Sequence, residues 1–157
     1  MKRSLARTMA VLTAFAALSM LSPPAIALDP VEDAANVLLP SDCSITAANP
    51  SLLAGTVRSS GTLQCSTQRD ALVIQVCLQY RQAVASENVT WQELACGTPQ
   101  TRQNATSVSG SVSARCLPGE WAYRAVATGQ VHRNGHVTQN GAGLKVSGVS
   151  IISCPLT

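Results

Sequence analysis

The chain has 157 residues, of which 46% are hydrophobic and only 3% aromatic, and its formal net charge is +3. Three of its 11 basic residues lie in the first seven positions, and the other eight balance eight acidic residues. A chain with neither a basic surplus nor a run of arginines does not favour nucleic acid or an anionic membrane as a partner. So few aromatic rings also argue against a stacking platform for sugars or single-stranded nucleic acid.

The first 27 residues have the features of a secretory signal peptide. Lys2 and Arg3 provide a basic start, residues 9–21 form an apolar run, and residues 25–27 read Ala-Ile-Ala, a small-residue cleavage motif. The apolar run is shorter than the roughly 20 residues that a membrane-spanning helix needs. We therefore expect cleavage after Ala27, a secreted mature chain, and no membrane attachment after cleavage.

Residues 28–42 form a separate N-terminal segment. Asp29 can cap a helix, Pro30 suits its first turn, and Pro40 ends the apolar stretch that follows. A helix this short is marginal on its own. The pattern leaves two alternatives open, a short helix or a disordered terminus.

Residues 43–157 are expected to form one all-β domain, built as an antiparallel sandwich. Serine, threonine, glycine and valine dominate this part of the chain, in short runs separated by turn residues. The longest apolar, β-branched run is residues 71–81, the expected central strand, with Leu72, Ile74 and Val76 on its inner face. The other expected strands are residues 44–47, 55–59, 62–66, 89–94, 107–115, 121–132 and 144–153.

All six cysteines follow the expected cleavage site, and an even number in an exported chain indicates three disulfides. Side-chain alternation places Cys77 with the polar residues on the outer face of the central strand. Cys96 shares the polar face of the next strand, which predicts a Cys77–Cys96 bond. The same alternation turns Trp91 inward and leaves Leu94 exposed.

The other four cysteines are assigned by the same argument. Cys65 and Cys116 share the apolar faces of their strands, so both are expected to point inward. Two inward cysteines on different layers predict a bond between the layers, Cys65–Cys116. Cys43 and Cys154, one near each end of the domain, remain as the third pair.

Turn chemistry predicts the C-terminal half of the domain. Asn134-Gly135 lies between residues 131–133 and 136–138, and this dipeptide is a strong hairpin signal because both residues tolerate positive φ. Residues 140–143, with two glycines, indicate a second turn or a bulge. The last strand changes its alternation near Gly148, which predicts a bulge there.

Loose motifs are spread over most of residues 55–154. They are residues 61–65, the Val-Cys-Leu-Gln of residues 76–79, Trp91, Cys96, and the Cys-x-x-Gly-x-x-x-Tyr-Arg of residues 116–124. Together they resemble a group of small secreted actinobacterial proteins of uncharacterised function. The resemblance implies an immunoglobulin-like β-sandwich and an exported protein, with no substrate or catalytic residue. A fainter resemblance links the chain to the actinomycete apoproteins that carry enediyne chromophores.

No assembled catalytic or metal site is recognisable. His132 and His136 flank the expected hairpin turn on opposite faces, and no third ligand lies near them in the sequence. Serines are abundant, but none sits in a Gly-x-Ser-x-Gly turn, and Glu120 is a strand length from the histidines. We therefore expect no catalytic residue, no cofactor and no metal.

These observations favour a secreted, non-enzymatic binding or interaction module. The expected binding surfaces are residues 130–143 and the loop of residues 97–104, because loops on a rigid scaffold often carry recognition. The partner is unknown, an extracellular protein or a cell-wall component. Two alternatives remain: a small secreted hydrolase that uses a serine with His132 or His136, and a chromoprotein-like small-molecule carrier with an apolar cleft.

Overall fold

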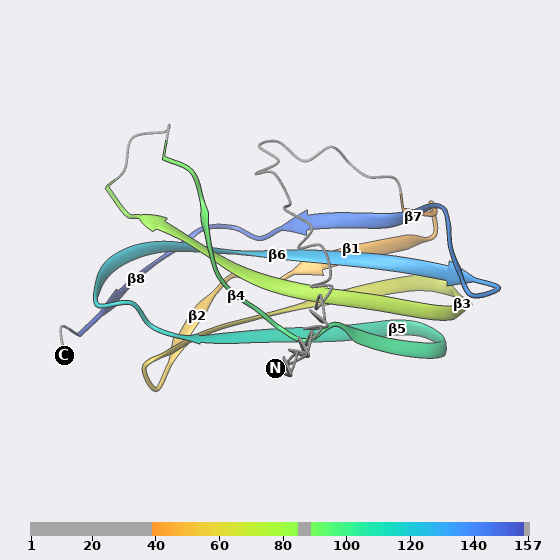
Figure 1. The fold of residues 1–157 in the computed structure, drawn as a ribbon, viewed down its shortest axis with the longest axis horizontal. Helices are drawn as coiled ribbons and strands as arrows, with labels where there is room; N and C mark the ends of the chain where they lie inside the picture. Colours follow the sequence, from red (N-terminus) through yellow and green to blue (C-terminus); the bar gives the residue numbers. More distant parts are fainter. Residues whose placement is uncertain (1–38, 85–88, 156–157) are drawn as a thin grey trace, which may run out of the picture.

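The computed structural model describes residues 39–84 and 89–155 (Figure 1). The expected signal peptide, and all but the last residues of the expected N-terminal segment, lie outside these ranges. The described chain is all-β and antiparallel, as its composition predicts, and it contains no helix able to cross a membrane. Its strands are β1 (Cys43–Ala47), β2 (Ser51–Leu53), β3 (Thr56–Gln82), β4 (Gln92–Cys96), β5 (Gln100–Arg115), β6 (Gly119–Arg133), β7 (His136–Val146) and β8 (Ser150–Cys154).

The strand β3 organises the fold, because its 27 residues serve two layers. Its first half, residues 56–65, pairs with β1 and β2 and with residues 107–115 of β5. Its second half, residues 71–82, pairs with β6, with β4 and with the start of β5. Figure 1 shows β3 and β5 folding back at the same end of the molecule. One continuous antiparallel sheet is thereby folded into two facing layers, a sandwich-like arrangement.

Layer 1 therefore holds β1, β2 and residues 56–65 and 107–115. Layer 2 holds residues 71–82 and 100–105, together with β4, β6, β7 and β8. The layers approach closely at glycines: a Cβ on Gly61 in layer 1 would lie 2.9 Å from the Cβ of Ala127 in layer 2. The core fills the space between them, as alternation in the central strand predicts. Its largest fully buried side chains are Tyr123, Leu63, Leu72, Ile74, Leu78, Val57, Val76 and Val131.

Several expected strand boundaries are wrong. The separate strands expected at residues 55–59, 62–66 and 71–81 are parts of β3, because the sheet bends where turn-like residues suggested an end. Residues 100–104, expected in a loop, belong to β5. Their side chains are mostly polar, but strand pairing is made by backbone groups, and this segment pairs with the second half of β3. The strand expected from residue 89 begins only at Gln92. The short strand β2 was not expected.

Two of the three expected disulfides are also wrong. Cys77–Cys96 is confirmed, and its two residues lie directly opposite each other on β3 and β4. Cys65 is buried, as predicted, yet it bonds Cys43, the residue opposite it on β1, rather than Cys116. The reason is that alternation gives the face on which a cysteine lies but not which strand is its neighbour.

The covalent link between the layers is Cys116–Cys154, and this bond and Cys43–Cys65 stand in place of the two expected pairs. Cys116 directly follows layer 1 at the end of β5, and Cys154 closes β8, which pairs with β6 in layer 2. Both side chains are buried. The inward position predicted for Cys116 is therefore correct, and so is a cysteine bond between layers, but the partner differs.

The C-terminal half follows its turn chemistry. Asn134 and Gly135 have φ values of 52° and 78°, and they join β6 to β7 with Arg133 opposite His136. Further from the turn, the ladder of β6 and β7 shifts register: His132 lies opposite Val137, but Gln130 lies opposite Ala142. The shift falls around residues 140–143, where a turn or bulge was predicted.

The strand expected at residues 144–153 is divided into the end of β7 and β8. Both parts pair with β6, with Val126 opposite Val146 and Tyr123 opposite Ser150. Two residues of β6 lie between these pairs, but three residues of the partner do. Ser147 fills this gap by donating its backbone N–H to the carbonyl oxygen of Ala125 over 2.9 Å. The bulge predicted near Gly148 is thus confirmed as one extra residue, but the strand is interrupted there.

The two layers also meet at the margin formed by β4 and β5. Gly97, just after β4, donates its backbone N–H to the carbonyl oxygen of Val76 over 2.8 Å. A Cβ on Gly97 would lie 2.1 Å from the carbonyl oxygen of Ser111 in layer 1, and such a contact is impossible without a backbone shift. Glycine is therefore required at this position for the layers to come together.

A polar network at the start of the domain supports the fold-back of β3. The Asp42 carboxylate accepts hydrogen bonds from the hydroxyls of Thr67, over 2.8 Å, and Ser66, over 3.2 Å, and it pairs with Arg69. The Thr67 hydrogen bond and the charge of Arg69 hold the pKa of Asp42 below its ordinary value of 3.8. This network fixes the residues that connect the two halves of β3.

Candidate functional site

The outer face of layer 2 carries a group of charged, polar and aromatic side chains that contact one another. Alternation along β3 sends Gln79 and Arg81 outward, and alternation along β6 does the same for Arg124. Trp91, which precedes β4, covers this surface. We call these four residues the Trp91 patch.

Trp91 is half-buried and contacts two arginines rather than the core. The guanidinium carbons of Arg81 and Arg124 lie 4.6 Å and 4.4 Å from the centre of its ring. Both distances are within the range of a cation–π interaction. The predicted inward position of Trp91 is therefore wrong.

A β-bulge explains this error. Cys77 and Leu78 lie opposite Cys96 and Ala95, but Gln79 lies opposite Glu93, so Leu94 is an extra residue in β4. One extra residue reverses the alternation on its N-terminal side. Leu94, expected to be exposed, packs against the core instead, and Trp91 is carried to the outer face.

Hydrogen bonding positions the arginine on β6. Arg124 donates its Nε hydrogen to Gln79 Oε1 over 2.8 Å, and the two residues are direct partners across the β3–β6 ladder. Arg81 lies diagonally from Arg124 on the same face, because it pairs with Ala122. Two full positive charges are thus held against one indole ring by two neighbouring strands.

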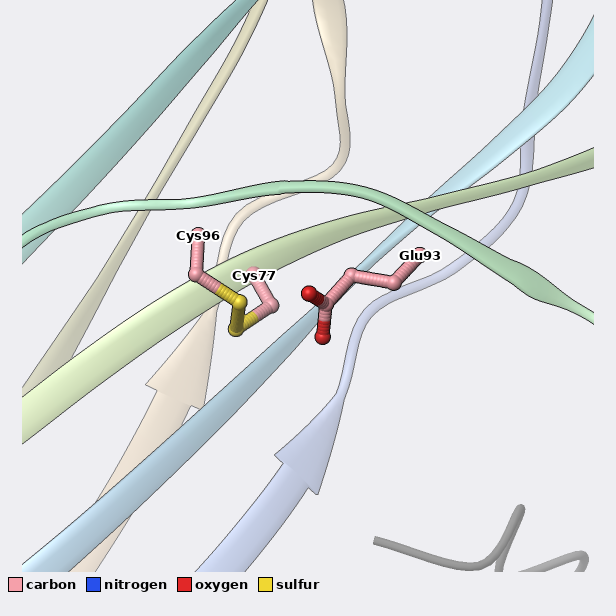
Figure 2. Close-up of side chains that lie close together, drawn as sticks. All are labelled: Cys77, Glu93 and Cys96. Carbon is pink, nitrogen blue, oxygen red and sulfur yellow. A yellow bond between two sulfur atoms is a disulfide. The ribbon is translucent and has the colours of Figure 1, made fainter. Parts of the chain in front are cut away.

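The Cys77–Cys96 disulfide anchors the β4 side of the patch. Figure 2 shows the carboxylate of Glu93 directed at this bond. The carboxylate and the two sulfur atoms lie within 4.8 Å of one another, an arrangement that could suggest a metal site. Both sulfurs are committed to the disulfide, however, so no thiolate is present to bind a metal.

The hairpin histidines do not form a site together. His132 lies opposite Val137 and His136 opposite Arg133, so the two imidazoles occupy opposite faces, as predicted. Among the described residues, none with a hydroxyl is hydrogen-bonded to either ring, and His132 Nε2 lies 3.4 Å from Gln130 Oε1.

An acid not expected near the hairpin does approach it. Asp70, 64 residues away in sequence, accepts a hydrogen bond from the backbone N–H of Asn134. Sequence spacing alone could not reveal this acid, because the fold-back of β3 brings it to the turn.

Two hollows on the described surface lie along β5. One, of about 360 Å³, lies where β5 bends and is lined by Gln68, Arg102, Asn104, Ala105, Thr106 and Ser107. The other, of about 490 Å³, lies at the margin closed by Gly97 and is lined by Arg58, Ser59, Cys96, Thr98, Ser111, Val112 and Ser113 as well. The expected binding segment of residues 97–104 contributes to both, whereas neither hollow includes a histidine.

Alternation along β3 and β6 is enough to put both arginines on the outer face, but it does not bring Trp91 to them. The missing information was the bulge at Leu94, which no glycine or proline marks. The signal for a surface site in the sequence was the polar outer face of the central strand, which carries Gln75, Gln79 and Arg81.

The fold and its bonds define the chain as a disulfide-bonded, antiparallel all-β protein suited to an oxidising environment. No protein-family model matches it, and no curated protein does. Among solved structures, it is similar to a protein from Archaeoglobus fulgidus, with 10% sequence identity and a TM-score of 0.34. That match covers 73% of this chain and 98% of the other, and a likeness this low supports no conclusion about function.

Proposed function

We propose that the chain is a secreted, non-enzymatic binding module that uses the Trp91 patch as its recognition surface. The observation that carries the proposal is the pair of guanidinium groups held against one indole on the outer face of a disulfide-pinned sheet. Tryptophan and arginine are the residues that most often dominate binding surfaces. This surface replaces the loops of the sequence-based expectation as the first candidate.

The scaffold supports this proposal in two ways. The Trp91 patch lies over paired strands, so its side chains lose little freedom when a partner binds. Three disulfides limit the unfolded chain, which suits a protein released outside the cell. Secretion, an immunoglobulin-like topology and the link to small actinobacterial proteins belong to the same proposal, which the signal-like N-terminus and the motif resemblance support.

The test compares retention of a partner by purified wild type and by Trp91→Ala. Each protein is immobilised and exposed to culture medium and to a cell-surface extract, and the retained protein and polysaccharide are identified. Arg115→Gln is the matched control, because Arg115 is an exposed residue of layer 1. We expect a component retained by the wild type and the control but not by Trp91→Ala. Equal retention by all three would refute the role of the patch.

A parallel assay addresses the hydrolase alternative. The wild type and a double variant, His132→Ala with His136→Ala, are tested on ester, glycoside and peptide substrates. The proposal predicts no turnover by either protein. Turnover that the double variant loses would establish an enzyme and overturn the non-enzymatic assignment.

A further inference from the structure

The Cys77–Cys96 disulfide is the most accessible of the three bonds. Cys96 is exposed and Cys77 is half-buried, whereas each of the other two bonds includes a buried cysteine. A thiolate breaks a disulfide by attacking one of its sulfur atoms directly, so access decides which bond is reduced first. We therefore expect a small thiol to open Cys77–Cys96 before the other two bonds.

Backbone pairing keeps the two cysteines together when this bond is open. Cys77 and Cys96 lie directly opposite each other on β3 and β4, and the next pair of the ladder is in register with them. On the other side, the backbone N–H of Gly97 donates to the carbonyl oxygen of Val76 over 2.8 Å. The two thiols that reduction produces are thus held at the same place on the outer face of layer 2.

Glu93 adds a carboxylate at this place because of the β-bulge in β4. Glu93 and Cys96 are three residues apart, and in a regular strand they would lie on opposite faces. The extra residue Leu94 brings both to the outer face, with Glu93 opposite Gln79. One carboxylate oxygen and the two sulfur atoms lie within 4.8 Å of one another (Figure 2). The Glu93 side chain forms no hydrogen bond or ion pair with the other described residues, so it is available as a ligand.

We propose that reduction of Cys77–Cys96 creates a zinc site, whose ligands are Cys77 Sγ, Cys96 Sγ and the Glu93 carboxylate. Zn²⁺ accepts both thiolates and carboxylates, whereas Ca²⁺ and Mg²⁺ disfavour thiolates. Ligand atoms on one zinc lie about 3–4 Å apart, since each bond is roughly 2.0–2.3 Å long. Small side-chain rotations therefore suffice to form the site, and its fourth position is open to water.

The chemistry balances as a two-electron exchange followed by metal binding. A dithiol reductant supplies two electrons and two protons to the Cys77–Cys96 bond and itself becomes a disulfide. The two thiols then lose two protons as they bind Zn²⁺. Oxidation by a disulfide reverses both steps and releases the metal, so β3 and β4 are cross-linked in either state, by sulfur or by zinc. None of the three ligands belongs to the Trp91 patch, so this site does not depend on the proposed function.

The experiment begins with the mature chain, treated without oxygen with a limiting amount of dithiothreitol that is then removed. Alkylation and peptide mass mapping identify the free cysteines. The two-thiol form is titrated with zinc chloride against a chromophoric chelator near pH 7, where free thiols are protonated. We expect Cys77 and Cys96 to be the first free pair, with one zinc bound per chain and two protons released per zinc. The oxidised chain should not compete with the chelator, and cobalt(II) should give the charge-transfer absorption of cobalt–thiolate bonds with the two-thiol form alone.

Variants identify the ligands. Glu93→Gln should weaken zinc binding about tenfold or more, because loss even of a group that only supports a ligand costs that much. Glu120→Gln removes the same charge from an exposed acid on β6, and it should bind zinc as the wild type does. Cys77→Ser combined with Cys96→Ser should abolish zinc binding and proton release. Circular dichroism checks that each variant and the two-thiol form are folded.

Several results would overturn the zinc site. They are reduction of another bond first, loss of the fold in the two-thiol form, absence of zinc binding by that form, and equal zinc affinity in Glu93→Gln and the wild type. The partner-capture experiment is made with the disulfide intact, so its outcome is independent of these results. If a partner is retained through Trp91 while the two-thiol form binds no zinc, the binding module stands and the zinc site fails.

Discussion

Replacing Gly97 by alanine tests how the two layers are held together. The added Cβ would lie 2.1 Å from the carbonyl oxygen of Ser111 and 3.1 Å from its carbonyl carbon. Both are backbone atoms of a paired strand, so neither can rotate away. The strain must be relieved by separating the layers or by moving residue 97.

Either response has an estimable cost. Moving residue 97 breaks its 2.8 Å hydrogen bond to the carbonyl oxygen of Val76 and weakens the 3.2 Å bond from Gln75 Nε2 to its own carbonyl. Overpacking a tight contact typically costs about 1–3 kcal/mol, and each lost hydrogen bond about 1 kcal/mol. We expect Gly97→Ala to lower the free energy of unfolding by about 3 kcal/mol.

Urea denaturation with the disulfides intact measures this loss, which should lower the midpoint while leaving the slope unchanged. The matched control is Gly148→Ala, because the atoms nearest to its Cβ belong to the Asn49 side chain, which can rotate. We expect the control to change stability by less than about 0.5 kcal/mol. A similar, small effect in both variants would show that the layers do not depend on the contact at Gly97.

Three further predictions concern stability. Because the pKa of Asp42 is lowered in the folded protein, its carboxylate stabilises the fold above the unfolded pKa of 3.8 and loses this effect as the pH falls. The difference in melting temperature between wild type and Asp42→Asn should therefore shrink from about pH 5 to about pH 2. Tyr123→Phe should cost about 1 kcal/mol in urea denaturation, because the backbone N–H that donates to the buried hydroxyl over 3.2 Å loses its acceptor; no loss would mean that water replaces the hydroxyl. Replacing both Cys116 and Cys154 by alanine should cost about 4 kcal/mol, the loop entropy for a separation of 38 residues; an unchanged midpoint would refute this.

The elements that the sequence predicts well depend on local chemistry. The turn at Asn134-Gly135 needs two positive φ angles, and those two residues tolerate them, so both its place and its pairing are as predicted. The same holds for the inner face of the central strand, whose alternation is unbroken over residues 72–78. All-β character and the outer position of Cys77 follow from these local patterns.

The elements that it predicts poorly depend on partners distant in sequence. Cys65 and Cys116 both point inward, but their partners are decided by strand pairing: β1 brings Cys43 to Cys65, and β8 ends at Cys154, the partner of Cys116. Trp91 was assigned to the wrong face because a single extra residue at Leu94 reverses the alternation. The candidate site is a product of that bulge, and this is why strand patterns alone did not reveal it.

The bond between Cys116 and Cys154 has a consequence for the protein under mechanical load. The 38 positions that it spans, which include β6, β7 and β8, cannot be stretched out while the bond is intact. At about 3.4 Å per extended residue, roughly 130 Å of contour length is withheld from a pulling force. A single-molecule extension trace should therefore lengthen by about that amount when a reducing agent is added. The intact bond gives this C-terminal quarter of the chain a resistance to traction that its hydrogen bonds alone would not supply.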